Sequence, residues 1–249
     1  MAGIAPEVRV FTDADALAQA AATLFTETAR DAISQRGRCM VCLSGGSTPS
    51  RTYALLAQGP LRHLIDWPRL LFYWGDERCV PPEDLNSNYR LAREMLLAKV
   101  PVLNENVHRV RTELGPDLAA EDYALTLNRN AEPPLRWPRL DLVILGLGED
   151  GHTASLFPAA SPPPGLAVFA VEARGAAPPG WRVSLTPEVF NSARRVVFLV
   201  QGAGKSAIVA RVLYGPYEPE SLPAQMIHQT DGEVIWLLDS GAAAGRASG

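Results

Sequence analysis

The 249-residue sequence has no long apolar run, no excess of basic charge and little cysteine. No apolar run approaches the roughly 18 residues of a membrane span, and Asp13, Asp15, Glu27 and Asp31 lie where a secretory signal would be apolar. The net charge of -4 gives no basic surface for nucleic acid. We therefore expect a cytoplasmic protein with no membrane partner and no nucleic-acid partner.

The sequence also lacks the usual signatures of metal and nucleophilic-serine chemistry. It contains no G-x-S-x-G elbow, no H-E-x-x-H segment and no cysteine cluster, so we expect no metal. Cys39 and Cys42 form a C-x-x-C pair inside an apolar run, where a spacing of three points them to opposite faces of a strand. We expect both to be buried small hydrophobic residues rather than a redox or metal pair.

The rest of the composition is that of a folded domain. A hydrophobic share of 47% and a charged share of 20% exclude a disordered chain, and 249 residues are enough for a substantial core. Apolar runs and helical periodicity alternate along the sequence, which predicts a parallel sheet covered by helices on both faces. We expect one domain over residues 1–249, with strands near 7–11, 38–43, 70–74, 107–110, 142–145, 167–171, 182–185, 194–200 and 232–238, and a frayed tail from residue 241.

The most informative stretch is DLVILGLGEDGHTASLFP at 141–158, where a buried strand runs into glycines, acids and a histidine. Its letters GLGEDG also match the dinucleotide pattern G-x-G-x-x-G, and Glu172 lies where a ribose-binding acid would be expected. However, Pro158 and the prolines at 162–164 leave no room for the helix that holds a pyrophosphate. The stretch therefore favours a ligand site beyond a strand end over a dinucleotide site.

Three other predicted strands also end in polar loops. Residues 44–48, SGGST, lead into a helix and could cradle a phosphate, although small residues also suit an ordinary turn. Residues 76–78, DER, place two acids beside an arginine and could instead form a salt-bridged loop. Lys205 opens a helix and could reach an anion, or could be a solvated surface lysine; the Walker A match fails because Leu199 occupies the position of the first glycine.

Together the four loops predict a site for a small phosphorylated anion. His152 follows Gly-Glu-Asp-Gly at a strand end, which suits a residue that moves a proton near neutral pH. The other histidines, His63, His108 and His228, have ordinary contexts and are expected to be structural or exposed.

The chain resembles the 6-phosphogluconolactonase family in five stretches: SGGSTP (44–49), GDERCVP (75–81), SNYR (87–90), DLVILGLGEDGHTASLFP (141–158) and RVSLTPEVFNSARRVVFLVQGAGKSAIV (182–209). The resemblance implies a mostly parallel central sheet with helices on both faces, a modified Rossmann-like fold of the NagB/RpiA/CoA transferase-like type. It also implies hydrolysis of 6-phospho-D-glucono-1,5-lactone to 6-phospho-D-gluconate in the oxidative pentose phosphate pathway, without a cofactor.

By the same resemblance, His152 is the general base that activates water. The resemblance places Arg78 against the sugar acid or the developing oxyanion, with Asp76 positioning Arg78 and Asp150 positioning His152. The substrate phosphate is expected on the loop formed by Gly45, Gly46, Ser47 and Thr48, together with Arg182 and Lys205.

Two alternatives remain open at this point. A glucosamine-6-phosphate deaminase-type isomerase shares the fold and phosphate site, but Arg78 after two acids and the ending HTASLFP favour the lactonase. A sugar-phosphate-sensing domain should carry a basic helix-turn-helix segment, which this sequence does not offer. We expect a monomer whose partner is its small-molecule substrate.

Overall fold

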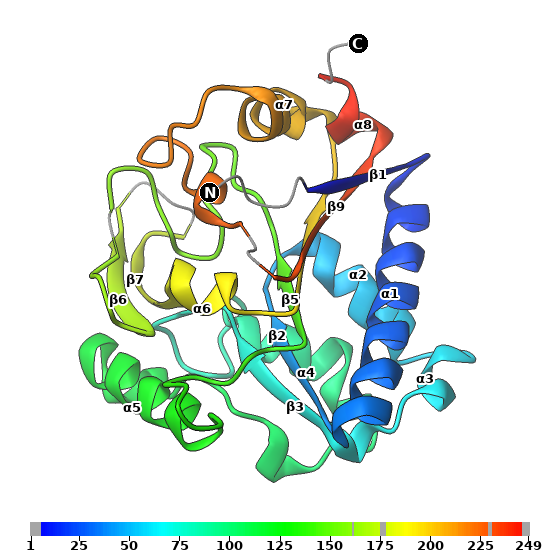
Figure 1. Cartoon of the computed structure of the whole chain (residues 1–249), viewed down its shortest axis with the longest axis vertical. Coiled ribbons are helices and arrows are strands. Elements are labelled where there is room, and N and C mark those ends of the chain that lie inside the picture. Colours follow the sequence, from blue (N-terminus) through cyan, green and yellow to red (C-terminus); the bar gives the residue numbers. More distant parts are fainter. Residues whose placement is uncertain (1–5, 161, 175–177, 229–230, 246–249) are drawn as a thin grey trace.

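The computed structural model describes residues 6–160, 162–174, 178–228 and 231–245. Within them, six parallel strands form the main sheet in the order β1-β9-β8-β5-β2-β3 (Figure 1). Their bounds are β1 Glu7–Phe11, β2 Cys39–Leu43, β3 Leu70–Trp74, β5 Leu142–Leu145, β8 Arg195–Val200 and β9 Glu233–Asp239. Every pairing in this sheet is parallel, as the alternation of strands and helices predicted.

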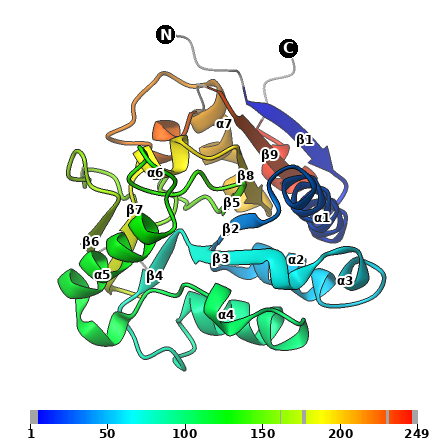
Figure 2. The same ribbon diagram turned by 60° about the horizontal axis from the view of Figure 1, so that its bottom comes forward.

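Helices cover both faces of the main sheet (Figures 1 and 2). Helices α1 and α2 pack against each other on one face, and α7 lies on the other face together with a second, smaller sheet. The helix bounds are α1 Ala14–Arg36, α2 Ser47–Leu56, α3 Leu61–Leu64, α4 Asn88–Met95, α5 Pro116–Arg129, α6 Pro187–Asn191, α7 Ser206–Tyr214 and α8 Ser240–Ala243. None of the described helices combines the length and apolar character needed to cross a membrane.

The smaller sheet was not predicted. It is antiparallel, in the order β4-β7-β6, with β4 spanning Asp76–Arg78, β6 Val168–Ala173 and β7 Gly180–Leu185. Residues 76–78 therefore form a strand instead of the loop that their sequence suggests. Three charged residues show no strand periodicity, and β4 forms because a distant segment, β7, pairs with it.

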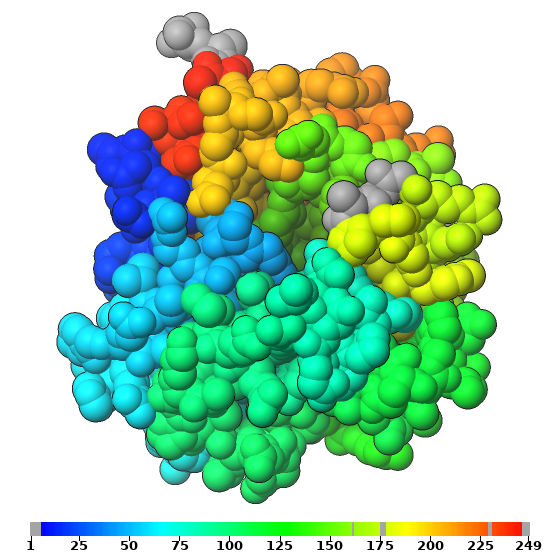
Figure 3. Space-filling view, turned by 180° about the vertical axis from the view of Figure 1, so that it is seen from behind, coloured from blue at the N-terminus to red at the C-terminus, as the bar shows by residue number. Residues whose placement is uncertain are grey.

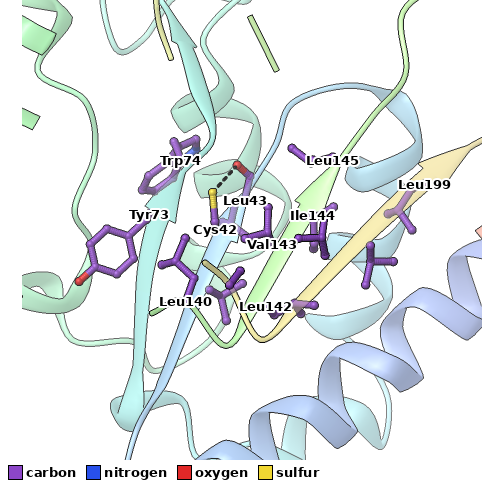
Figure 4. Close-up of a cluster of buried hydrophobic side chains, with 14 of the residues drawn as sticks. Cys42, Leu43, Tyr73, Trp74, Leu140, Leu142, Val143, Ile144, Leu145 and Leu199 are labelled. Carbon is purple, nitrogen blue, oxygen red and sulfur yellow. Dashed lines mark hydrogen bonds between the residues drawn. The ribbon is translucent and has the colours of Figure 1, made fainter. Parts of the chain in front are cut away.

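The main sheet is held by apolar residues on both of its faces. Every residue of β2 and β5 is buried, which is typical of central parallel strands. Figure 4 shows the cluster that they form, in which Leu43, Val143 and Leu199 come from three neighbouring strands. Cys39 and Cys42 are both fully buried in β2, as the sequence predicted.

A buried carboxylate ties together the start of the central strands, at the end of the sheet away from the glycine-rich loops. Asp141 is 4% exposed and accepts a hydrogen bond from the Met40 backbone N–H at 2.8 Å. It also pairs with Arg36 at 2.8 Å, at the end of α1, and with Arg194 at 3.4 Å, just before β8. One side chain thus joins α1, β2, β5 and β8 at that end of the sheet.

Two expected features differ in the structure. The strand expected at 107–110 is only an isolated bridge between Val107 and Phe72, because the chain meets the edge of β3 at one residue and then leaves it. The tail expected to fray from residue 241 instead begins within helix α8, which is capped by the Asp239 side chain and contains the buried Ala242. Residues 246–249 of that tail lie outside the described residues.

A second buried carboxylate, Glu77 of β4, fixes the start of α4. Glu77 is 2% exposed and accepts hydrogen bonds from the backbone N–H groups of Arg78, Asn88 and Tyr89 at 2.7–2.8 Å and from the Ser87 hydroxyl at 3.1 Å. Burial raises the pKa of Glu77, although these backbone hydrogen bonds act to lower it. Because the first N–H groups of a helix have no partner inside the helix, Glu77 supplies the acceptor that α4 needs.

We expect Glu77→Ala to lower the free energy of unfolding by about 3 kcal/mol, since three backbone N–H groups, one buried and two partly buried, lose their acceptor. Urea unfolding followed by circular dichroism measures this change. Glu83→Ala, an exposed acid on the neighbouring loop, is the matched control and should stay within about 0.5 kcal/mol of wild type. Equal urea midpoints for the two variants would contradict the capping role of Glu77.

Candidate active site

Four adjacent strands of the main sheet bring the polar loops together. Strands β8, β5, β2 and β3 are neighbours and parallel, so their carboxyl ends lie at the same edge of the sheet. The strand order reverses between β2 and β5. From β2 the chain continues to β3 on one side, and from β5 it continues to β8 on the other side. In open α/β sheets such a switch point is where ligands bind.

A cavity of about 600 Å³ opens at this edge, a size that suits a small molecule. Figure 3 shows the molecule hollowed where the gold, green and teal segments meet. All ten site residues expected from the sequence line this cavity: Gly45, Gly46, Ser47, Thr48, Asp76, Arg78, Asp150, His152, Arg182 and Lys205.

The loop after β5 holds His152 against Asp150. The imidazole Nδ1 lies 2.5 Å from the Asp150 Oδ1 atom, which also accepts a hydrogen bond from the His152 backbone N–H at 3.1 Å. Burial raises the pKa of Asp150, but these hydrogen bonds and the nearby imidazole outweigh it and hold the pKa below its usual range. The carboxylate is therefore charged at neutral pH and orients the ring through Nδ1.

Glycines make room for this arrangement. A Cβ atom at Gly148 would lie 2.1 Å from the His152 Nδ1 atom, so any side chain there would displace the imidazole. Gly151 has a φ of 86° and a Cβ there would lie 2.8 Å from Leu222, so the turn before the histidine also requires glycine.

The loop after β2 leads directly into a helix. Helix α2 begins at Ser47, so the first N–H groups of the helix and the positive end of its dipole lie at the cavity wall. Gly46 has a φ of 108°, which favours glycine. A Cβ atom at Gly45 would lie 1.8 Å from the Asn88 Oδ1 atom, so the loop can only take this path with glycine at position 45.

The small sheet contributes two arginines that face one another. Arg78 of β4 and Arg182 of β7 occupy opposite positions in the antiparallel pair, where like charges repel. The Nε atoms of both are buried and have no hydrogen-bond partner within the described residues. Burial lowers the pKa of Arg182, with Asp76 and Glu77 opposing this and Arg78 adding to it. An anion in the cavity would relieve the repulsion between the two arginines.

The partner of Asp76 differs from the expected one. Asp76 was expected to position Arg78, but its Oδ2 atom lies 3.9 Å from an Arg182 nitrogen, and Arg78 donates to the Asn86 carbonyl at 2.6 Å. The reason is the β4–β7 pairing, which places Arg182 beside the buried Asp76 carboxylate. The Asp76 carboxylate therefore lies beside the second arginine of the pair.

On the far side of the cavity, Lys205 lies at the end of a short 3-10 helix, Ala203–Lys205. Its Nζ atom is 3.9 Å from the Glu149 carboxylate, which is 81% exposed and can move away from it. Gln201, at the end of β8, donates a hydrogen bond to the Ser47 hydroxyl at 3.3 Å and connects this side to the α2 loop.

Sequence reasoning missed several residues that shape the cavity. Asn88 lines it and donates to both the carbonyl and the carboxylate of Asp76, at 2.9 and 3.1 Å. The sequence analysis included Asn88 only within the SNYR stretch at 87–90, and nothing local could reveal its contact with a strand twelve residues earlier. In the part of the chain that the structure describes, no three His, Cys, Asp or Glu side chains are grouped to hold a metal ion.

Comparison with known proteins places this chain in a family. The family model for glucosamine-6-phosphate isomerases/6-phosphogluconolactonase matches residues 12–236. The 6-phosphogluconolactonase of Synechocystis sp. is 36% identical over 245 residues, which cover 96% of this chain and 98% of that protein.

Comparison with solved structures agrees with this family match. The 6-phosphogluconolactonase of Trypanosoma brucei is 30% identical and superposes with a TM-score of 0.85, over 99% of this chain and all of that one. A monomeric glucosamine-6-phosphate deaminase superposes with a TM-score of 0.80 over 96% of this chain and all of that one; at 20% identity, this likeness shows the fold alone. The chain therefore belongs to the glucosamine-6-phosphate isomerase/6-phosphogluconolactonase family, and within it to the 6-phosphogluconolactonases.

Proposed function

We propose that this chain hydrolyses 6-phospho-D-glucono-1,5-lactone to 6-phospho-D-gluconate, as a carboxylic ester hydrolase of the oxidative pentose phosphate pathway. The names of its relatives support the reaction. The observation that carries the proposal is the His152–Asp150 pair, which shares one cavity with a helix N-terminus and two facing arginines. A base beside an anion site is what hydrolysis of a phosphorylated ester needs.

The phosphate of the substrate would bind where the cavity offers most donors. The loop of Gly45, Gly46, Ser47 and Thr48 presents backbone N–H groups and two hydroxyls at the start of α2. Arg182 would add a planar fork of donors and Lys205 a mobile point charge, and these suit a phosphate dianion. Glu149 would release Lys205 when the phosphate arrives, because a 3.9 Å pair with an exposed acid is weak.

The chemical step needs a base for water. With Nδ1 held by Asp150, the other ring nitrogen of His152 can accept a proton from water, whose oxygen then attacks the lactone carbonyl carbon. The tetrahedral oxyanion collapses and breaks the bond to the ring oxygen, which takes the proton back from the imidazolium. Water and the lactone are the only reactants, and the carboxylic acid that forms then releases its proton to the solvent as it becomes the carboxylate.

Arg78 would stabilise the negative charge that develops during this step. Arg78 lines the cavity, and its positive guanidinium group would attract an oxyanion that forms there. Asp76, 3.9 Å from the Arg182 guanidinium, would balance part of its charge without occupying its hydrogen-bond donors.

We expect His152→Ala to lower kcat by about a hundredfold or more, because the general base is lost. The assay uses freshly made lactone coupled to 6-phosphogluconate dehydrogenase, corrected for spontaneous ring opening. His63→Ala, an exposed histidine on α3, is the matched control and should keep the wild-type rate.

Two outcomes of this assay would count against the proposal. A His152→Ala variant with the full rate would make His152 a structural residue. A wild-type protein that leaves the lactone unchanged but deaminates glucosamine 6-phosphate would replace the lactonase reaction with that of the deaminase-type isomerases.

We expect Gly45→Ala to raise KM by about tenfold or more, because the new methyl group would collide with Asn88 and push the phosphate loop from its path. Steady-state kinetics and competitive inhibition by inorganic phosphate both measure this loss. Gly204→Ala is the matched control: a Cβ there meets no atom within 4 Å, and KM should not change. Equal KM values for the two variants would contradict the proposal that the substrate phosphate binds to this loop.

A further inference from the structure

Ser155, three residues after His152, connects the loop of the proposed base to the small sheet. It is completely buried, and its hydroxyl donates a 2.6 Å hydrogen bond to the Asp76 Oδ2 atom. Its backbone N–H donates to the Ser184 hydroxyl of β7 at 3.3 Å. The residue before it, Ala154, has a φ of 49°, so the chain accepts an unfavourable backbone conformation to deliver Ser155 there.

Asp76 is an unusual carboxylate because its hydrogen bonds come from neutral groups. It is 6% exposed, and its Oδ1 atom accepts from the Asn88 side-chain amide at 3.1 Å. Its Oδ2 atom takes the Ser155 hydroxyl and lies 3.9 Å from Arg182, which is too far for a hydrogen bond. The Oδ2 atom is thus hydrogen-bonded to the Ser155 hydroxyl but not to the Arg182 guanidinium.

This distance matters for the anion site. Arg182 is 4% exposed, and its guanidinium has the Pro178 carbonyl at 3.1 Å and the ring of Phe157 at 5.5 Å as its other neighbours. A hydrogen-bonded pair with Asp76 would neutralise Arg182 and occupy the donors that a phosphate needs. Such a pair is strong at a buried position, so a phosphate would have to break it before binding.

We propose that Ser155 is a positioning residue that acts through Asp76. By satisfying the Oδ2 atom, it holds the carboxylate off Arg182 and keeps the guanidinium free for the substrate phosphate. This role deepens the proposed function and rests on it, because it names what sets phosphate affinity at that same site. His152 precedes Ser155 on one short segment, so the same link also fixes the base relative to the anion site.

The first test compares Ser155→Ala with wild type. We expect KM for the lactone to rise roughly tenfold while kcat changes less than about threefold, because one hydrogen bond to a charged group is lost from the binding apparatus. Isothermal titration with inorganic phosphate should show the same tenfold weakening. Ser192→Ala removes a comparable hydroxyl that bonds Trp137 and the Val189 carbonyl away from the cavity, and should leave both values unchanged.

The decisive test repeats Ser155→Ala in an Asp76→Asn background. A neutral amide at position 76 does not compete for Arg182, so we expect removal of the hydroxyl to change phosphate affinity less than about twofold there. An equal loss in both backgrounds would overturn the proposal, since Ser155 would then act without Asp76. A fall in kcat with unchanged KM and phosphate affinity would overturn it too.

The phosphate titration separates this proposal from the lactonase proposal. If wild type shows no lactonase activity but Ser155→Ala still binds phosphate more weakly than wild type, the proposed reaction is wrong and the role of Ser155 is supported. An active wild type with a fully wild-type Ser155→Ala variant would defeat the role of Ser155 alone.

Discussion

The parallel pairing of β2 with β5 and β3 is the constraint on which the rest of the molecule depends. It forces the loops after neighbouring strands to one edge of the sheet, so residues about a hundred positions apart line one cavity. Hydrophobic burial on both faces fixes the strands, and the Asp141 cluster fixes their opposite ends. The loops at the cavity edge can therefore carry glycines, charged side chains and an unfavourable φ without supporting the fold themselves.

The charges in the cavity follow a common pattern. Asp150 is engaged by the His152 ring and backbone, and Asp76 by Ser155 and Asn88, so neither carboxylate forms a hydrogen-bonded pair with an arginine. The arginines face each other across β4 and β7 with their charges only loosely balanced. These two acids of the cavity are thus already hydrogen-bonded while the arginines lack close carboxylate partners, an arrangement that suits an anionic ligand before the ligand arrives.

Much of the site could be predicted from the sequence because its elements are local. A short apolar run followed by glycines, acids and hydroxyls marks a strand end at 44–48 and again at 146–152. The small sheet could not be predicted, since β4 has three charged residues and exists only through pairing with a segment about a hundred residues later. For the same reason the sequence linked Asp76 to its neighbour Arg78, whereas the fold places it beside Arg182. Ser155 and Asn88 also contact Asp76, from 79 and 12 residues away in the sequence.

The cavity is shared between two sheets, with His152 and the α2 loop on the main sheet and both arginines on the small one. Phe157 spans the two, with its ring 5.0 Å from the His152 ring and 5.5 Å from the Arg182 guanidinium. The spacing between the two sheets therefore sets the width of the cavity. A shift of the small sheet as a unit would move both arginines relative to His152 and the α2 loop, and would therefore change the size of ligand that the cavity admits.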